Sequence, residues 1–146
     1  MKVTIAIAVS IGLAAIAPCY STLRAQQATS RSVLDGVYTE EQAKRGELAY
    51  GTTCASCHGP TLAGTEMAPP LTGAAFTSNW TDTTVCDLFQ KIRVSMPADN
   101  PGSLSAEQIA DIVAFLLTLD KFPAGNTELG SETETLKQIR IEAPKH

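Results

Sequence analysis

The first stretch of the chain with helical periodicity begins at Thr39. Thr39 and Gln42 have the spacing of a capping box, which predicts a helix from residue 40 to about residue 52 or 53. Small and apolar residues recur along this segment, among them Gly46 in its middle. A glycine inside a helix costs about 1 kcal/mol relative to alanine, so Gly46 is either a tolerated weak spot or, the interpretation we favour, a point where another helix approaches closely.

Two further helices are predicted by the same signals. Thr84 precedes an apolar stripe at helical spacing, and Pro97 ends it. Ser105 and Gln108 repeat the capping-box spacing and open a helix over about residues 106–119 that has one broad apolar face.

The segments between and around these helices lack a strand pattern. Residues 59–79 are rich in glycine, proline and threonine and are expected to form an ordered loop. Ser131 and Glu134 suggest a third capping box, which opens a short helix through about residue 139. Residues 26–38 show little periodicity and are expected to be a flexible arm. The predicted fold class is therefore all-α with long loops.

The N-terminus has the form of an export signal. Lys2 is followed by Val3–Ala17, a stretch of fifteen residues without a charge that is too short to cross a bilayer. We expect residues 1–25 to be a signal peptide that is cleaved after Ala25. A lipid anchor on Cys19 is disfavoured because Pro18 precedes it. The chain is therefore expected to be periplasmic or otherwise exported, without a stable membrane span after cleavage.

Composition narrows the possible functions. The chain has 146 residues, a single domain's length, and 11 basic against 15 acidic residues, with no basic run. The acidic net charge and the lack of a basic run exclude a nucleic-acid-binding surface. Aromatic residues make up only 5% of the chain, which is a low proportion for the core of a small protein. After signal cleavage three cysteines remain, and an odd number argues against a disulfide framework.

The candidate chemistry lies in the segment Cys-Ala-Ser-Cys-His at residues 54–58. The C-x-x-C-H string is the covalent attachment signal for c-type haem. Cys54 and Cys57 would reach the two vinyl groups of one porphyrin edge, and His58 would then lie under the iron. A thioredoxin-like motif would need a strand–helix pattern that is missing here. A zinc site would need Cys86 and the terminal His146.

With this motif the chain resembles the class I c-type cytochromes, which are electron carriers with one covalently bound haem c. The resemblance covers residues 39–120 and also rests on residues 68–71, Trp80, Met96-Pro97 and the apolar helix that follows. It implies that the N- and C-terminal helices cross and that the haem fills the core. It leaves residues 121–146 as a C-terminal extension.

The second axial ligand has three candidates: Met67, Met96 and His146. Met67 follows His58 too closely for the chain to reach the opposite haem face with ease, whereas Met96 matches the distal loop of the family. We therefore expect His58 and Met96 to ligate the iron.

The resemblance also implies roles around the ligands. It places the Pro69 carbonyl where it accepts a hydrogen bond from His58 Nδ1, at the ordinary separation of 2.7–3.2 Å. Trp80 either binds a haem propionate through its indole N–H or is a packing residue.

The implied function is one-electron transfer from a dehydrogenase to a respiratory acceptor, by a protein that is not itself an enzyme. The tail at residues 121–140 resembles cytochromes linked to quinoprotein dehydrogenases, so a partner or haem subunit of a pyrroloquinoline quinone-dependent dehydrogenase is an alternative. Peroxidase-like chemistry would follow if Met96 left the iron open. Only Lys91 and Arg93 are basic near the Met96 loop, which argues against a strongly acidic partner.

Overall fold

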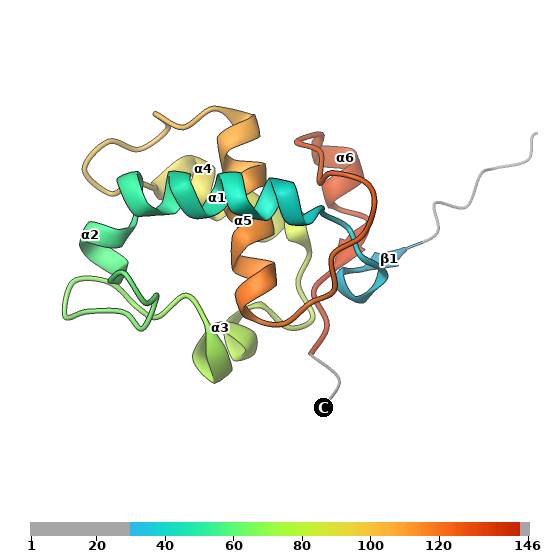
Figure 1. Ribbon diagram of the computed structural model, residues 1–146, viewed down its shortest axis with the longest axis horizontal. Helices are drawn as coiled ribbons and strands as arrows, with labels where there is room; N and C mark the ends of the chain where they lie inside the picture. The colour runs from blue at the N-terminus through green and yellow to red at the C-terminus, as the bar shows by residue number, and fades with distance from the viewer. Residues whose placement is uncertain (1–29, 144–146) are drawn as a thin grey trace, which may run out of the picture.

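The computed structural model describes residues 30–143, and helices dominate them (Figure 1). The elements in chain order are β1 (Arg31–Ser32), a 3-10 turn η1 (Val33–Asp35), α1 (Glu40–Thr53), α2 (Ala55–His58), α3 (Gly73–Trp80), α4 (Val85–Ser95), α5 (Ala106–Leu119), α6 (Thr133–Leu136) and β2 (Ile139–Arg140). The three long helices predicted from the sequence correspond to α1, α4 and α5. The predicted signal peptide lies outside the described residues.

Helices α1 and α5 cross in direct contact, and Gly46 lies at the crossing. A Cβ atom on Gly46 would lie 1.9 Å from the Asp111 carbonyl oxygen and 2.9 Å from Phe115 Cβ. The rings of Tyr50 and Phe115 meet at the same contact, with centroids 5.6 Å apart. The close approach predicted from Gly46 is confirmed.

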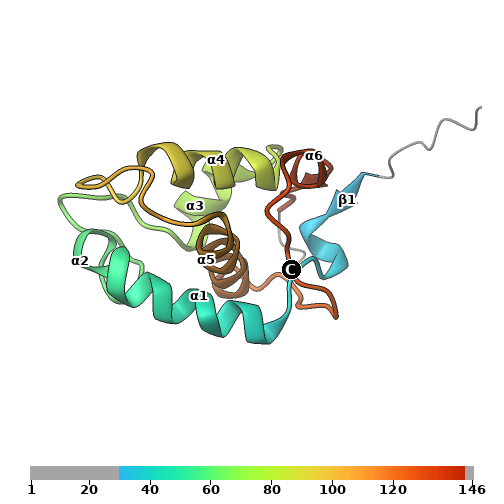
Figure 2. The same ribbon diagram turned by 90° about the horizontal axis from the view of Figure 1, so that it is seen from above.

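Helix α5 supplies more buried residues than any other described element, eight in all. Figure 2 shows α5 enclosed between α1 on one side and α3 and α4 on the other. Within residues 30–143 no helix combines the length and apolar character needed to cross a bilayer.

Complete capping boxes form at the N-termini of two of the three long helices. Thr84 with Asp87 caps α4, and Ser105 with Gln108 caps α5, each as a reciprocal capping box. At α1 only half of the box forms, since the Thr39 hydroxyl accepts from the Gln42 backbone N–H. The Gln42 side chain is committed elsewhere.

The prediction that residues 26–38 form a flexible arm is wrong for residues 30–38, the part that the structure describes. Strand β1 pairs in parallel with β2, and Arg31 lies opposite Ile139. Val33 is fully buried in the core, as are the nearby Val37 and Tyr38. These few apolar residues are too short a run to show periodicity, but they are buried through contacts with the distant C-terminal segment.

Two other predictions are corrected. Residues 73–80 form helix α3 inside the segment expected to be loop, and its N-terminus is capped from a distance: Gly73 N–H donates to Asp120 Oδ1 over 2.8 Å. The short helix α6 begins after Glu132 without a side-chain cap and ends at Leu136. The predicted box at Ser131 is therefore absent, and the end of that expected helix is strand β2.

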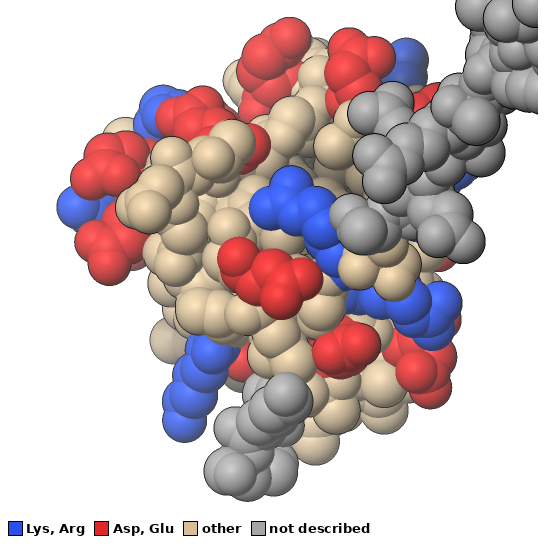
Figure 3. Space-filling view, turned by 90° about the vertical axis from the view of Figure 1, so that its right-hand side faces the viewer, with Lys and Arg blue, Asp and Glu red and all other residues tan. Residues whose placement is uncertain are grey.

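The C-terminal segment, residues 121–143, packs along the first helix and the N-terminal segment. Gln42 Nε2 donates to the Leu129 carbonyl over 2.9 Å, and the Leu129 N–H donates back to Gln42 Oε1 over 2.7 Å. Tyr38 O–H donates to the Phe122 carbonyl over 2.6 Å. On this side of the molecule acidic and basic side chains are interspersed (Figure 3). The segment is therefore part of the folded unit and not a loose tail.

Candidate functional site

The motif spans the junction of α1 and α2: Cys54 lies between the two helices, and Cys57 lies within α2. Cys54 caps α1, with its N–H donating to the Tyr50 carbonyl over 2.9 Å. The Cys54 carbonyl accepts from the N–H groups of Cys57 and His58, at 3.1 and 3.0 Å. Both thiols are unpaired and partly exposed. A single turn of chain therefore presents two free thiols and a histidine.

His58 is held in a defined orientation. Its side chain is buried, and Nδ1 lies 2.8 Å from the Pro69 carbonyl oxygen, which is within the separation expected from the sequence. The carbonyl can only accept, so the proton of a neutral ring resides on Nδ1. No hydrogen bond among the described residues engages Nε2. This leaves Nε2 with a lone pair that can bind a metal.

The loop after His58 is fixed to the motif by a small network. Tyr50 O–H donates to the Gly59 carbonyl, and Thr65 O–H donates to the Cys57 carbonyl, each over 2.5 Å. The Gly64 N–H donates to the His58 carbonyl over 3.0 Å. Gly64 has φ of 79°, and a Cβ there would lie 2.7 Å from Pro70 N. Only glycine fits this tight return of the chain toward Pro69.

Several apolar side chains on the elements near this turn are only partly buried. Leu71, Trp80, Met96 and Leu104 each pack against the buried core and keep accessible surface. Trp80 packs against Phe76 with tilted rings whose centroids lie 6.3 Å apart. No hydrogen bond among the described residues involves the Trp80 indole N–H, so its packing role is observed and its propionate role stays a prediction.

The side chains of the two candidate methionines, Met96 and Met67, differ in their exposure to solvent. Met96 is the C-cap of α4, with its N–H on the Ile92 carbonyl, and its side chain is partly buried. Met67 is 74% exposed. The loops that carry them lie at the same end of the molecule as α2 in both ribbon views (Figures 1 and 2). His146 lies outside the described residues.

Burial determines the thiol chemistry. Desolvation raises the pKa of Cys54, although the Thr53 hydroxyl opposes this, so the thiol stays protonated at neutral pH.

Cys86 lies instead at the start of α4, close to Glu134 and Lys137 near α6. Within residues 30–143 no three His, Cys, Asp or Glu side chains cluster as a metal site. The zinc alternative therefore has no support among these residues.

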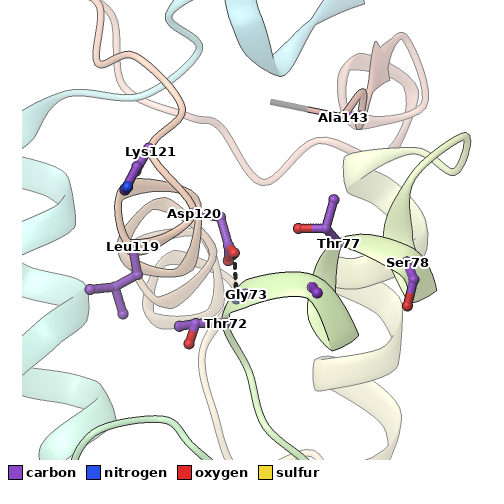
Figure 4. A pocket seen from close by; sticks show the side chains of 9 residues that line it. Thr72, Gly73, Thr77, Ser78, Leu119, Asp120, Lys121 and Ala143 are labelled. Carbon is purple, nitrogen blue, oxygen red and sulfur yellow. Dashed lines mark hydrogen bonds between the residues drawn. The ribbon is translucent and has the colours of Figure 1, made fainter. Parts of the chain in front are cut away.

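One buried carboxylate was not found from the sequence. Asp120 caps α3 and lines a pocket with Thr72, Thr77 and Lys121 (Figure 4). Its Oδ2 is buried without a hydrogen-bond partner, and desolvation raises its pKa. None of the lining residues belongs to the 54–58 motif or the Met96 loop. No local signal could have revealed this cap, because 47 residues separate its two partners.

Comparison with known proteins agrees with this geometry. Residues 41–116 match the family model described as cytochrome C oxidase, cbb3-type, subunit III. That match covers more than half of the chain. The chain belongs to this family of class I c-type cytochromes. The all-α, cytochrome c-like fold predicted from the sequence is thereby confirmed.

A solved structure shares the cytochrome fold. It is the crystal structure of the sulfane dehydrogenase SoxCD from Paracoccus pantotrophus, with 24% sequence identity and a TM-score of 0.51. The match covers 67% of this chain and 52% of that one, so this cytochrome spans about half of the chain it resembles. A search of the curated proteins gave no match.

The residues present fit the haem c that the cytochrome family implies. The two thiols are free, the His58 Nε2 lone pair is uncommitted, and the surrounding apolar side chains keep accessible surface. Membership of the cytochrome c family implies electron transfer through a covalently bound haem.

Proposed function

We propose that this cytochrome is an exported one-electron carrier with a single haem c. In this proposal Cys54 and Cys57 would hold the haem through thioether bonds, and His58 Nε2 and Met96 would bind its iron. The haem supplies a one-electron couple, and a histidine–methionine pair favours its reduced state. With both axial positions occupied, the protein carries electrons and does not bind substrate.

The observation that supports this assignment best is the hydrogen bond from His58 Nδ1 to the Pro69 carbonyl. It fixes the ring tautomer, so that Nε2 is the ligating nitrogen, and it makes the imidazole a stronger donor. The network through Thr65 and Gly64 keeps Pro69 in place when the iron changes its charge. A site that reorganises little transfers electrons with a small barrier.

The assignment of Met96 is supported by its place at the end of α4. The ordered helix presents Met96 to the same end of the fold as His58, whereas Met67 is directed into solvent. A soft thioether suits a haem iron that cycles between two oxidation states.

The direction of electron flow is also a proposal. We assign a dehydrogenase as donor and a respiratory component as acceptor. The alternative, a partner or haem subunit of a pyrroloquinoline quinone-dependent dehydrogenase, rests on the tail at residues 121–140. Because that tail packs on the cytochrome domain, it needs no partner to explain it.

Spectroscopy on the exported protein tests the haem assignment. We expect haem that stays with the denatured chain, one haem per chain, and a weak sulfur-to-iron band in the ferric form. Cys54→Ala and Cys57→Ala should each sharply lower the yield of covalent holoprotein, while Cys86→Ala should not. Equal covalent haem in all three variants would refute the attachment sites.

A further inference from the structure

Asp120, the C-cap of α5, has a buried carboxyl group whose two oxygens differ in their surroundings. The residue is only 6% exposed. Its Oδ1 accepts a hydrogen bond from the Gly73 N–H over 2.8 Å, whereas Oδ2 is buried and has no hydrogen-bond partner among the described residues. A negative charge on such an oxygen is costly, and the cost is removed when a proton binds there. Proton binding at Oδ2 leaves the Oδ1 bond intact, so the carboxyl group can change its charge without releasing α3.

A short segment of chain joins this carboxyl group to the proximal side of the candidate haem site. Gly73 follows Pro69 by four residues, and the Pro69 carbonyl holds the His58 ring at 2.8 Å. Four residues span at most about 14 Å, so the Asp120 carboxyl group lies within roughly 25 Å of the His58 ring when both hydrogen bonds are included. The two groups are also both buried, and solvent screens buried charges less than exposed ones.

We infer that Asp120 binds a proton when the haem binds an electron, and thereby links the reduction potential of this cytochrome to pH. The inference rests on the proposed carrier function and adds a regulation of the same site. Reduction by a one-electron donor removes one positive charge from the iron, so a nearby carboxylate is less stabilised. Oδ2 then takes one proton from solvent water, and Asp120 changes from carboxylate to carboxylic acid. Oxidation returns the electron to an acceptor and the proton to water.

The pocket beside Asp120 offers the proton a path from solvent. It has a volume of about 640 Å³, and its lining includes the hydroxyl side chains of Thr72, Thr77 and Ser78. In Figure 4 the Thr77 hydroxyl lies on the side of its residue that faces the Asp120 carboxyl group. A hydroxyl group both donates and accepts hydrogen bonds. Together with water, these groups can pass a proton to an oxygen that solvent does not reach directly.

Few other charges face Asp120 from the elements packed around it. Lys121 is the only other charged residue that lines the pocket, and α3 and residues 69–72 contain no charged side chain. Glu142 lies beside the pocket residue Ala143, and its carboxylate accepts a hydrogen bond from the Ser32 hydroxyl over 2.9 Å. The raised pKa of Asp120 is caused by burial, which its hydrogen bond from Gly73 opposes, and no charged neighbour contributes. A change of charge at the iron is therefore not masked by an ion beside Asp120.

Voltammetry of the holoprotein across a range of pH measures this linkage. At an effective dielectric constant of about 20, one unit of charge changes a proton affinity about threefold even at roughly 25 Å. For one electron a threefold change corresponds to about 28 mV, at about 59 mV per tenfold. We expect the reduction potential to fall by this amount or more as the pH rises from about 4, the ordinary value for aspartate, toward neutrality.

Two matched variants identify the titrating group. Asp120→Asn keeps an acceptor for the Gly73 N–H but cannot titrate, so the fall in potential should disappear. Asp82→Asn is the control, because Asp82 lies just beyond α3 with its side chain 88% exposed, and asparagine tolerates its φ of 67°. That variant should keep the fall. A fall of the same size in Asp120→Asn and wild type would assign the titration to other groups, such as the haem propionates, and would overturn the inference.

Carbon-13 NMR of protein labelled at its aspartate carboxyl carbons gives a second readout. The Asp120 signal should titrate at a higher pH in the reduced protein than in the oxidised protein, and the Gly73 amide signal should follow the same midpoint. Equal midpoints in both oxidation states would refute the linkage. If no reversible one-electron couple is seen, the carrier function fails and the linkage fails with it. If the couple is normal but independent of pH, the carrier function stands and this inference alone is wrong.

Discussion

Replacement of Gly46 by alanine should damage the crossing of α1 and α5. The new methyl group would lie 1.9 Å from the Asp111 carbonyl oxygen, a backbone atom that cannot rotate away. Overpacking of this kind costs about 1–3 kcal/mol or more, and separation of Tyr50 from Phe115 removes about 0.5–1.5 kcal/mol. Improved helix propensity returns only about 1 kcal/mol. We therefore expect the free energy of unfolding to fall by roughly 0.5–3.5 kcal/mol.

Urea unfolding of the holoprotein measures this loss. With a typical dependence of about 1–3 kcal/mol per molar urea, the midpoint should fall by roughly 0.2–3.5 M. Gly51→Ala is the matched control, because Gly51 lies on the same helix and a Cβ there would meet nothing within 4 Å. That variant should gain about 0.4–1 kcal/mol. If both variants gain stability, the helices do not approach each other as described.

Three further substitutions test other parts of the structure. Gln42→Ala leaves the Leu129 N–H and carbonyl unpaired, so the free energy of unfolding should fall by roughly 3 kcal/mol. Proteases should also cut the chain faster after residue 121, and an unchanged digestion pattern would contradict this. Asp120 has a raised pKa in the folded state, so its ionised form costs stability as the pH rises through and above its unfolded pKa of about 3.9. Asp120→Asn keeps the acceptor and should be more stable than wild type at neutral pH by on the order of 1 kcal/mol, with the difference shrinking toward pH 3 in denaturation curves; a constant difference would exclude the carboxylate as its cause. Met96→Ala should lower the reduction potential and speed cyanide binding to the ferric protein, and Met67→Ala should do neither; the reverse pattern in voltammetry and binding kinetics would exchange the two assignments.

The parts of the fold found from sequence are those with short-range signals. The Thr84 and Ser105 caps act on residues three positions away, and both form as predicted. The Cys54–His58 motif is likewise local, whereas its hydrogen bond to Pro69, eleven residues away, was expected only from the family resemblance. Such interactions depend on spacing that can be counted in the sequence.

The parts that were missed depend on partners far along the chain. Helix α3 takes its cap from Asp120, and strand β1 takes its hydrogen bonds from β2. Gln42 has capping-box spacing, but its side chain binds Leu129, 87 residues away. Contacts of this range are decided by tertiary packing, which outweighs local propensity.

The pairing of β1 with β2 brings the two ends of the described chain together. Arg31 lies opposite Ile139, and Figures 1 and 2 show this pair at the end of the molecule away from α2. The two ends of the described residues therefore lie on the side of the fold remote from the Cys54–His58 motif. A protein that docks beside the motif would leave the β1–β2 pair uncovered, so the ends of the folded part stay free for attachment to a larger assembly.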